Sequence, residues 1–321
     1  METWYEHNTF HHSQFSDIER LVALKKEQGL KISVALPTLN EENTIAKEIV
    51  LIKSELMERH KLVDELAVID SGSSDDTREI SNRFKADVYL SEEILPDMGS
   101  YKGKGENLWK ALYVLKGDII VYIDADIKNI HPKFVYGLVG PLLENEEIGY
   151  VKAFYRRPIT RGIKTFPSGG GRVTQILVRP LFNAFFPKLS GLVQPLSGEY
   201  ASRRKILEGV PFFIGYGVET GLLIDIFNKF GLDAIAQVDM DRRVHRNQGI
   251  LGLGRMSYGI LQTFMNRAEA LGRLKISDEI PVLFKQMVEK NGKRNFKEFE
   301  IREVERPPMI TVDAYRKKRG L

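Results

Sequence analysis

Short apolar runs alternate with amphipathic segments through the first half of the chain, and this alternation constrains the fold more than any other feature. Strands are expected at 31–36, 65–69, 86–90 and 117–123, with helices at 41–59, from residue 75 and at 105–115. A repeated strand-helix-strand order predicts parallel strands joined by right-handed crossovers. The run 119–122 is apolar throughout, as in strands covered on both faces. We therefore expect an α/β fold with a mostly parallel sheet flanked by helices.

Aspartates stand where two of these strands end. Asp70 and Ser71 follow the second strand, and Asp124-Ala125-Asp126 follows the fourth. Ligands in open α/β sheets bind at the carboxyl ends of strands, so these carboxylates are candidates to face a metal-bound diphosphate. The triplet alone is a weak signal, because aspartates also end strands as turn formers. Asp75 and Asp76 are better explained as acids in the favourable first turn of a helix.

Two loops near these strand ends carry residue types that suit a nucleotide. Pro37 and Leu39 can flank a base, and Glu41 can accept hydrogen bonds from a ribose or a base edge. An ordinary helix start with Asn40 as the N-cap explains the same residues. Lys104 lies between two glycines, where the backbone can approach an anion closely and the ammonium can reach a phosphate or base oxygen.

The pattern loosens beyond about residue 155. Helices are expected at 217–230 and 250–274 and a strand at 234–238, whereas 169–171 is a glycine loop. The aromatic segment 180–187 is interpreted as a packing or subunit-contact segment. Glu199 and Glu219 are both candidate site carboxylates. Glu199 either lines the same region as Glu219 or is a buried carboxylate paired to an arginine, so Glu219 is the stronger candidate. No role is assigned to the histidines between residues 7 and 12.

Composition excludes several classes of function. The 321 residues exceed a typical single-domain length, which predicts a large α/β domain with an appended lobe, or two domains. A net charge of +4 helps to attract a phosphorylated substrate but is low for a nucleic-acid binder. The absence of cysteine excludes disulfides and thiolate chemistry. We find neither a signal peptide nor an apolar stretch that could cross a bilayer, so we expect a cytoplasmic protein without a membrane or nucleic-acid partner.

Several motifs together resemble a known family. Their order is Pro37-Thr38-Leu39-Asn40-Glu41-Glu42, Asp70-Ser71-Gly72-Ser73-Ser74-Asp75-Asp76-Thr77 and Asp124-Ala125-Asp126, which is similar to nucleotide-sugar glycosyltransferases of the GT-A fold. Further motifs resemble one retaining branch, the glucosyl-3-phosphoglycerate synthases: Gly103-Lys104-Gly105-Glu106, Gly170-Gly171-Arg172-Val173-Thr174, Gly215-Tyr216-Gly217-Val218-Glu219 and Val244-His245-Arg246-Asn247-Gln248. The resemblance covers about residues 31–260.

The resemblance implies a GT-A type, Rossmann-like sheet with a C-terminal acceptor-binding lobe. We expect an N-terminal extension (1–30), a nucleotide-sugar-binding α/β region (31–155), an acceptor-binding and catalytic region (156–275) and a charged helical C-terminal tail (276–321). Donor contacts are implied for Pro37, Leu39, Glu41, Asp70, Ser71, Lys104, Asp124, Ala125, Tyr216, Glu219, Arg243 and Met256.

The resemblance also implies a divalent metal. Asp126 would be the direct ligand and His245 would complete the protein ligands, with Asp124 contacting the nucleotide or supporting the ligands. Hard oxygen ligands suit Mg²⁺ or Mn²⁺. A solvated basic loop is the alternative for His245. The catalytic residues would be Asp126, Arg243 and Glu219.

Acceptor contacts are implied for Gly171, Arg172, Val173, Thr174 and Asn247. The guanidinium of Arg172 can pair with two phosphate oxygens at once, although a triple glycine is also typical of a loop without a ligand.

The implied activity is retaining transfer of glucose from a nucleotide donor, UDP-glucose first, to the 2-hydroxyl of D-3-phosphoglycerate, in compatible-solute or polysaccharide biosynthesis. The alternatives are mannosyl transfer from GDP-mannose, transfer to a polyprenyl phosphate at a membrane, and a nucleotide-sugar-binding protein without activity. A homodimer is expected.

Overall fold

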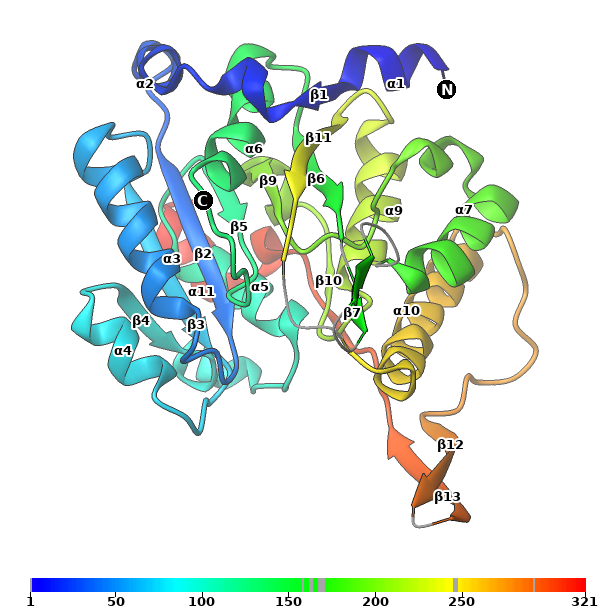
Figure 1. Cartoon of the computed structure of the whole chain (residues 1–321). Helices are drawn as coiled ribbons and strands as arrows, with labels where there is room; N and C mark the ends of the chain where they lie inside the picture. Colours follow the sequence, from blue (N-terminus) through cyan, green and yellow to red (C-terminus); the bar gives the residue numbers. More distant parts are fainter. Residues whose placement is uncertain (1, 158, 162–163, 167–170, 245–247, 291) are drawn as a thin grey trace.

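An eight-stranded, mostly parallel sheet forms the centre of the molecule. The computed structural model describes residues 2–157, 159–161, 164–166, 171–244, 248–290 and 292–321. The sheet has the order β1-β11-β6-β9-β5-β2-β3-β4 (Figure 1). Its strands, in chain order, are β1 (Thr9–His11), β2 (Ile32–Thr38), β3 (Glu65–Asp70), β4 (Asp87–Leu90), β5 (Ile119–Tyr122), β6 (Tyr150–Arg156), β9 (Tyr200–Arg203) and β11 (Ile235–Arg242). All neighbours are parallel except that β9 runs antiparallel to β5 and β6. The predicted fold class is confirmed.

Helices cover both faces of this sheet. Successive side chains of a strand point to opposite faces, and β5 accordingly supplies Ile120 and Tyr122 to one core and Ile119 and Val121 to the other. The first core is completed by α5 (Lys104–Val114), α7 (Arg179–Phe185), α9 (Val218–Phe230) and α10 (Ile250–Ala270). The second is completed by α2 (Ile18–Glu27), α3 (Ile45–Leu51) and α6 (Lys133–Glu144).

The remaining elements are short. They are the helices α1 (Glu2–Asn8), α4 (Thr77–Arg83), α8 (Arg204–Glu208) and α11 (Asp313–Arg319), the π-helices η2 (Ile52–Arg59) and η5 (Thr174–Val178), and the 3-10 turns η1 (His12–Phe15), η3 (Ser91–Glu93), η4 (Pro96–Met98), η6 (Pro187–Gly191) and η7 (Met309–Thr311). Three strand pairs lie outside the sheet: β7 (Ile159–Arg161) with β8 (Lys164–Phe166), β10 (Phe212–Phe213) with β14 (Glu305–Arg306), and β12 (Leu283–Lys290) with β13 (Lys293–Glu300). In the described ranges no helix is long and apolar enough to cross a membrane.

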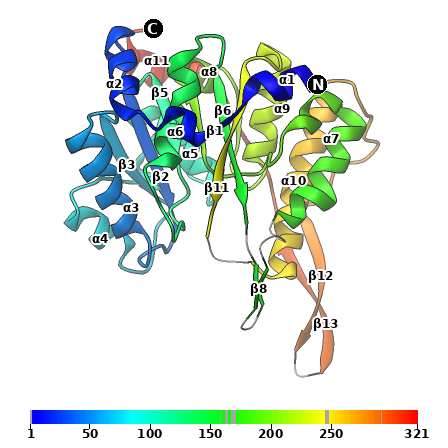
Figure 2. The ribbon, with the colours of Figure 1, turned by 45° about the horizontal axis from the view of Figure 1, so that its top comes forward.

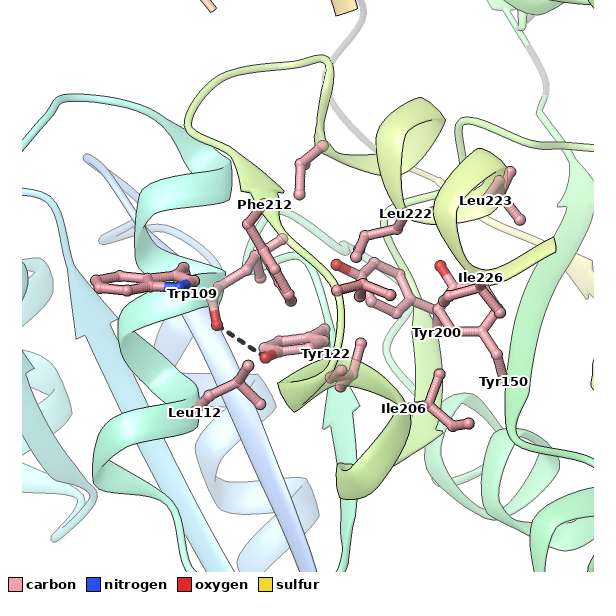
Figure 3. Close-up of a cluster of buried hydrophobic side chains, with 14 of the residues drawn as sticks. Trp109, Leu112, Tyr122, Tyr150, Tyr200, Ile206, Phe212, Leu222, Leu223 and Ile226 are labelled. Atoms are coloured by element: carbon pink, nitrogen blue, oxygen red, sulfur yellow. Dashed lines mark hydrogen bonds between the residues drawn. The ribbon is translucent and has the colours of Figure 1, made fainter. Parts of the chain in front are cut away.

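Buried tyrosines from three neighbouring strands meet near the end of β5: Tyr122 is the last residue of β5, whereas Tyr200 and Tyr150 are the first residues of β9 and β6. The rings of Tyr122 and Tyr150 lie 5.1 and 5.3 Å from the ring of Tyr200, which stands between them (Figure 3). The Tyr122 hydroxyl donates to the carbonyl oxygen of Leu108 at 2.8 Å, which ties β5 to α5. Because Tyr122 precedes Asp124 by two residues, this cluster forms a rigid floor beneath the loop that carries Asp124.

The N-terminal segment contributes strand β1 to the main sheet. β1 pairs in parallel with β11, placing Thr9 opposite Gln237. Trp4 is buried, and its indole N–H donates to the carbonyl oxygen of Ile235 at 3.0 Å. This segment therefore covers an edge of the sheet that would otherwise leave backbone groups unpaired.

The predicted helix start at Asn40 is wrong. β2 continues to Thr38, with Pro37 opposite Ile69 of β3. The strand tolerates a proline here because Pro37 lies beyond the residues of β2 that pair with β5. Asn40 has a φ of 59°, and its side-chain oxygen accepts from the backbone N–H of Ser74 at 2.8 Å. Asn40 thus links two loops at the carboxyl edge, and α3 begins five residues later.

The predicted helical C-terminal tail is also wrong. Residues 283–300 form the hairpin β12–β13, which projects away from the body in both views (Figures 1 and 2). The sequence carries one signal for it, the dipeptide Asn291-Gly292, which is typical of two-residue hairpin turns. Among the described residues of this region, α11 is the one α-helix, preceded by the 3-10 turn η7.

The aromatic segment 180–187 is a packing segment. Phe182 and Phe186 are each 1% exposed, and the Phe186 ring meets that of Phe264 edge to face at 5.6 Å. Their side chains are therefore not available to contact a second subunit.

Replacing Phe186 by alanine should lower the free energy of unfolding by about 3–5 kcal/mol, the usual cost of a phenylalanine-sized core cavity. Urea denaturation followed by tryptophan fluorescence measures this change. The matched control is Ile176→Ala, because Ile176 is 74% exposed, and it should change stability by at most about 0.5 kcal/mol. Equal effects of the two substitutions would contradict the packing role.

Candidate functional site

Six charged side chains from five segments meet at the carboxyl edge of the sheet. They are Lys104 at the start of α5, Asp124 and Asp126 after β5, Glu199 before β9, Glu219 in α9 and Arg243 after β11. The carboxyl ends of parallel strands share one edge, and the antiparallel β9 brings its amino end there. Residues far apart in sequence therefore form one site.

Lys104 connects two carboxylates. Its ammonium lies 2.5 Å from Asp124 Oδ1 and 2.8 Å from Glu219 Oε1. The flanking glycines allow this position, because a Cβ at Gly103 or Gly105 would overlap the carbonyl oxygen of Ile214 or Phe213. The predicted donor residues Lys104, Asp124 and Glu219 are thus brought together.

Arg243 connects three carboxylates. Its Nη2 lies 2.7 Å from Asp126 Oδ1, 3.0 Å from Asp124 Oδ2 and 3.0 Å from Glu199 Oε1. The guanidinium is 3% exposed and Glu199 is fully buried, with a further hydrogen bond from the Tyr155 hydroxyl. Glu199 is therefore the buried carboxylate paired to an arginine, and that arginine is itself part of the site.

The charges shift several pKa values. Burial opposes the ionisation of Asp124, but Lys104 and Arg243 outweigh it and hold the pKa of Asp124 below its usual range. Burial raises the pKa of Asp126 and of Glu199, Arg243 opposes the rise, and the Asp124 charge adds to it. Burial opposes the charge of Lys104, but Asp124 and Glu219 outweigh it and raise the pKa of Lys104.

A divalent cation fits this donor set. Among the residues that the structure describes, these four carboxylates are in direct contact with two cations, Lys104 and Arg243. Asp126 is 27% exposed, so its carboxylate is accessible, and oxygen donors are what Mg²⁺ and Mn²⁺ prefer. The other predicted ligand, His245, lies outside the described residues.

A bulge at the end of β11 precedes Arg243. The register of β11 against β6 shifts between Asp239 and Arg242, and Asp241 has a φ of 61°, a conformation that aspartate tolerates better than most residues. The Asp241 carboxylate is held by His11 at 3.1 Å and by His12 at 2.6 Å. Bulges next to active sites commonly redirect a side chain, and here the side chain of Arg243 is buried in the site while that of Arg242 is exposed.

These histidines therefore have a structural role that the sequence did not indicate. In the described part of the chain, His11, His12 and Asp241 are also the one group with ligand atoms close enough for a metal. The ammonium of Lys133, however, lies 2.8 Å from Asp241 Oδ2 and 3.5 Å from His12 Nε2. A cation thus already neutralises the cluster.

The predicted nucleoside loops lie side by side. Asp70 is fully buried and accepts from the backbone N–H groups of Gly72 at 3.0 Å and Ser73 at 2.8 Å, and from the Thr38 hydroxyl at 2.9 Å. It therefore holds the turn after β3. The backbone N–H of Glu41 is bound by the Thr77 hydroxyl at 2.8 Å.

Other predicted donor residues differ in exposure. Leu39 and Tyr216 are 54% and 47% exposed, as side chains that meet a ligand can be. Ser71 and Pro37 are half-buried beside them, and Ala125 is buried next to Asp126.

The predicted acceptor residues are only partly described. Gly171 has a φ of 76°, and the Arg172 guanidinium donates to the carbonyl oxygen of Gln248 at 2.9 Å. This contact brings the glycine loop to the segment before α10, which carries Met256. Val173 and Thr174 are buried at 7% and 3% exposure, so Val173 can offer only its backbone. Asn247 lies outside the described residues.

Lys152 is a buried site neighbour that sequence reasoning missed. It is 1% exposed, lies 4.5 Å from the centre of the Tyr200 ring and donates to the Tyr150 hydroxyl at 3.4 Å. Burial lowers the pKa of Lys152 to about 7, although the Glu219 charge opposes the fall. A strand position with a lysine between apolar residues was the available signal.

Replacing Lys152 by methionine should make the protein more stable, and more so at low pH. A folded-state pKa of about 7 lies below the 10.5 of an ordinary lysine, so the unfolded chain binds more protons between these values and wild-type stability rises with pH across them. The gain in free energy of unfolding from Lys152→Met should be largest below pH 7 and shrink towards pH 10.5. Urea denaturation at several pH values measures it, with the exposed Lys26→Met as control; a gain that does not change with pH would contradict the prediction.

Comparison with known proteins identifies the family. A model described as Glycosyl transferase family 2 matches residues 33–209. A glucosyl-3-phosphoglycerate synthase from Petrotoga mobilis is 55% identical over 310 residues, covering 97% of this chain and 95% of the relative.

Solved structures share the fold over nearly the whole chain. Glucosyl-3-phosphoglycerate synthase from Mycobacterium tuberculosis, in complex with Mn²⁺, UDP-glucose and phosphoglyceric acid, has a TM-score of 0.80 and 43% identity over 94% of this chain and 97% of its own. Mannosyl-3-phosphoglycerate synthase from Rubrobacter xylanophilus has a TM-score of 0.87 and 38% identity over 95% of this chain and 96% of its own. The chain belongs to the glucosyl-3-phosphoglycerate synthase family, within glycosyl transferase family 2.

Proposed function

We propose that the protein is a metal-dependent retaining hexosyltransferase that moves glucose from UDP-glucose to the 2-hydroxyl of D-3-phosphoglycerate. The observation that carries the proposal is the network in which Lys104 and Arg243 hold four carboxylates at the carboxyl edge of the sheet. The family membership supplies the substrate classes, since the Mycobacterium tuberculosis relative has been solved with UDP-glucose and phosphoglyceric acid.

The donor lies across the strand ends in this proposal. Pro37 and Leu39 flank the base, and Glu41 accepts from the ribose or base edge. Lys104 contacts the nucleotide, while Glu219 accepts hydrogen bonds from the hexose hydroxyls. The bridge from Lys104 to Glu219, at 2.8 Å, supports one continuous donor site.

Asp126 holds the metal, together with His245 and the donor diphosphate. Mg²⁺ or Mn²⁺ bound there would neutralise the diphosphate and polarise its bond to the sugar. Burial is the main cause of the raised pKa of Asp126, and the Asp124 charge adds to it. A bound cation would stabilise the anion at such a place, which supports this assignment.

The transfer needs no nucleophile from the protein. The bond from the anomeric carbon to the diphosphate oxygen breaks, the bond to the acceptor 2-oxygen forms on the same face, and the departing oxygen takes the hydroxyl proton. Arg243 stabilises the negative charge that develops on the leaving group, an electrostatic effect that is strong in a largely buried site. Its 3% exposure supports that role.

The acceptor binds beside the glycine loop. Arg172 pairs with the phosphate of phosphoglycerate, and Gly171, Thr174 and Asn247 complete the contacts. The bond from Arg172 to Gln248, at 2.9 Å, supports a site built between this loop and the segment after β11.

Three other functions are alternatives. Mannosyl transfer from GDP-mannose is favoured by the likeness to the Rubrobacter xylanophilus mannosyl enzyme. Transfer to a polyprenyl phosphate would call for membrane association. A nucleotide-sugar-binding protein without turnover shares the fold, but an assembled set of catalytic charges supports activity.

A matrix of donors and acceptors tests the proposal. Purified protein with Mg²⁺ and D-3-phosphoglycerate should convert UDP-glucose to glucosyl-3-phosphoglycerate, and GDP-glucose, GDP-mannose and ADP-glucose more slowly, as measured by product mass. Asp126→Ala should abolish turnover, because it removes the protein carboxylate that holds the metal. Faster turnover with GDP-mannose than with UDP-glucose would overturn the proposed glucosyl transfer in favour of mannosyl transfer. Normal activity of Asp126→Ala would remove Asp126 from the metal site.

We also propose that the protein acts in the cytoplasm, in compatible-solute or polysaccharide biosynthesis, as a homodimer. The hairpin β12–β13 supports the dimer, because Met287 and Phe296 lie opposite each other and are 51% and 70% exposed. A two-stranded hairpin is marginally stable alone, and a second copy would cover this apolar pair.

Phe296→Ser should convert the dimer to a monomer, since it removes the largest apolar side chain of the exposed pair. Sedimentation velocity measures the change. Ile176→Ser alters a side chain of 74% exposure elsewhere and should leave the dimer intact. A dimer in both variants would place the interface off the hairpin.

A further inference from the structure

The carboxylate of Glu303 lies behind the turn that begins α9. Its Oε2 accepts from the backbone N–H of Gly215 at 2.9 Å, and its Oε1 accepts from that of Gly217 at 3.1 Å. These residues bracket Tyr216, and Glu219 follows in the first turn of the helix. A side chain from the C-terminal region thus holds the turn that is proposed to meet the donor hexose.

Three glycines leave room for this carboxylate. A Cβ at Gly215 would overlap Glu303 Oε1, one at Gly217 would overlap the Thr263 hydroxyl, and one at Gly259 would lie 2.7 Å from Glu303 Oε1. Gly259 belongs to α10, so the socket is built from two separate elements. The glycines on either side of Tyr216 therefore have a packing reason that is independent of any ligand.

The segment that carries Glu303 is fixed at several points. The backbone N–H of Ile214 donates to the carbonyl oxygen of Val304 at 3.0 Å, and Gln262 of α10 accepts from the backbone N–H of Glu303 at 3.2 Å. Three residues further on, Arg306 pairs with both oxygens of the buried Glu106, at 2.8 and 2.6 Å. Glu303 is thus held on both sides.

The charge of Glu303 is costly at this place. Burial raises the pKa of Glu303 to about 7, the backbone N–H groups of Gly217 and Gly215 oppose the rise, and the Glu219 charge adds to it. A carboxylate in such surroundings needs the hydrogen bonds it receives, and the two N–H groups would otherwise lack an acceptor. The arrangement locks turn and carboxylate together.

We propose that Glu303 is a positioning residue for donor recognition: by fixing the N–H groups of Gly215 and Gly217, it sets the place of Tyr216 and Glu219 against the hexose. This inference rests on the proposed function for the identity of the donor. Glu303 itself touches no substrate, so its removal should impair recognition of the sugar and spare recognition of the nucleotide.

The test compares Glu303→Gln with wild type in two ways. Calorimetric titration with Mg²⁺ should show about a 10- to 100-fold weaker binding of UDP-glucose, as expected on losing a hydrogen bond to a charged group, whereas UDP binding stays within about twofold since Lys104 and the nucleoside loops are intact. Hydrogen exchange of the amides in 214–219 should become faster, because glutamine keeps one acceptor oxygen and presents an N–H₂ group to the second amide.

The control is Glu300→Gln, the same substitution at a side chain that is 66% exposed, which should change neither measurement. Equal weakening of UDP and UDP-glucose would show a general structural defect and overturn the proposal, as would unchanged exchange in 214–219. If wild type binds neither nucleotide, the proposed function fails, and the exchange measurement alone decides whether Glu303 fixes the turn. Glu303→Asp, which keeps the charge on a shorter stem, should restore part of the sugar-dependent affinity.

Discussion

A buried guanidinium surrounded by carboxylates is the interaction on which the site depends. Arg243 joins Asp124 and Asp126, which both follow β5, to Glu199, which precedes β9. Removing one member of such a cluster leaves uncompensated charge in a poorly solvated place, so buried pairs are costly to break even where they add little net stability. The surplus of carboxylates is the physical reason to expect a divalent cation. The same surplus means that the charged cluster stabilises the fold less than apolar packing in its place would. Its value lies in holding charge at fixed positions before a donor arrives.

The position of Arg243 depends in turn on parts of the chain distant from it in sequence. Asp241 adopts a left-handed conformation at the bulge, and it is held there by His11, His12 and Lys133. The first strand of the chain therefore stabilises the backbone that directs an active-site arginine. Below the site, the tyrosines of β5, β6 and β9 pack together beneath the loop that follows β5.

Sequence reasoning succeeded where local patterns coincide with the overall fold. The apolar period of β2, β3 and β5 and the glycines around Lys104 were sufficient to place the strand ends and Lys104 at one edge of the sheet, because both features are local. It failed at Asn40, where a hydrogen bond to Ser74 overrides a common capping preference, and at 276–321, where the charged composition outweighed the signal of an Asn-Gly turn. Glu199 was left undecided because it precedes an antiparallel strand, so a search for residues that follow strands passes over it. Glu303 and Asp241 carry no local signal, since their partners lie on other elements, and Lys152 had only the weak signal of a lysine between apolar residues of a strand.

The return of the chain after the hairpin has a consequence for how the protein is made. The turn at 215–217 is synthesised well before Glu303, and Glu106 well before Arg306, yet each needs its later partner. During translation the sheet can pair while this turn still lacks its acceptor and a buried glutamate lacks its arginine, and one of the two cores also waits for Met309, Val312 and Tyr315. Completion of the turn before α9 is therefore a late event in the life of the nascent chain, and a ribosome-bound intermediate that stops before residue 303 would carry the carboxyl edge of the sheet with Gly215 and Gly217 not yet fixed.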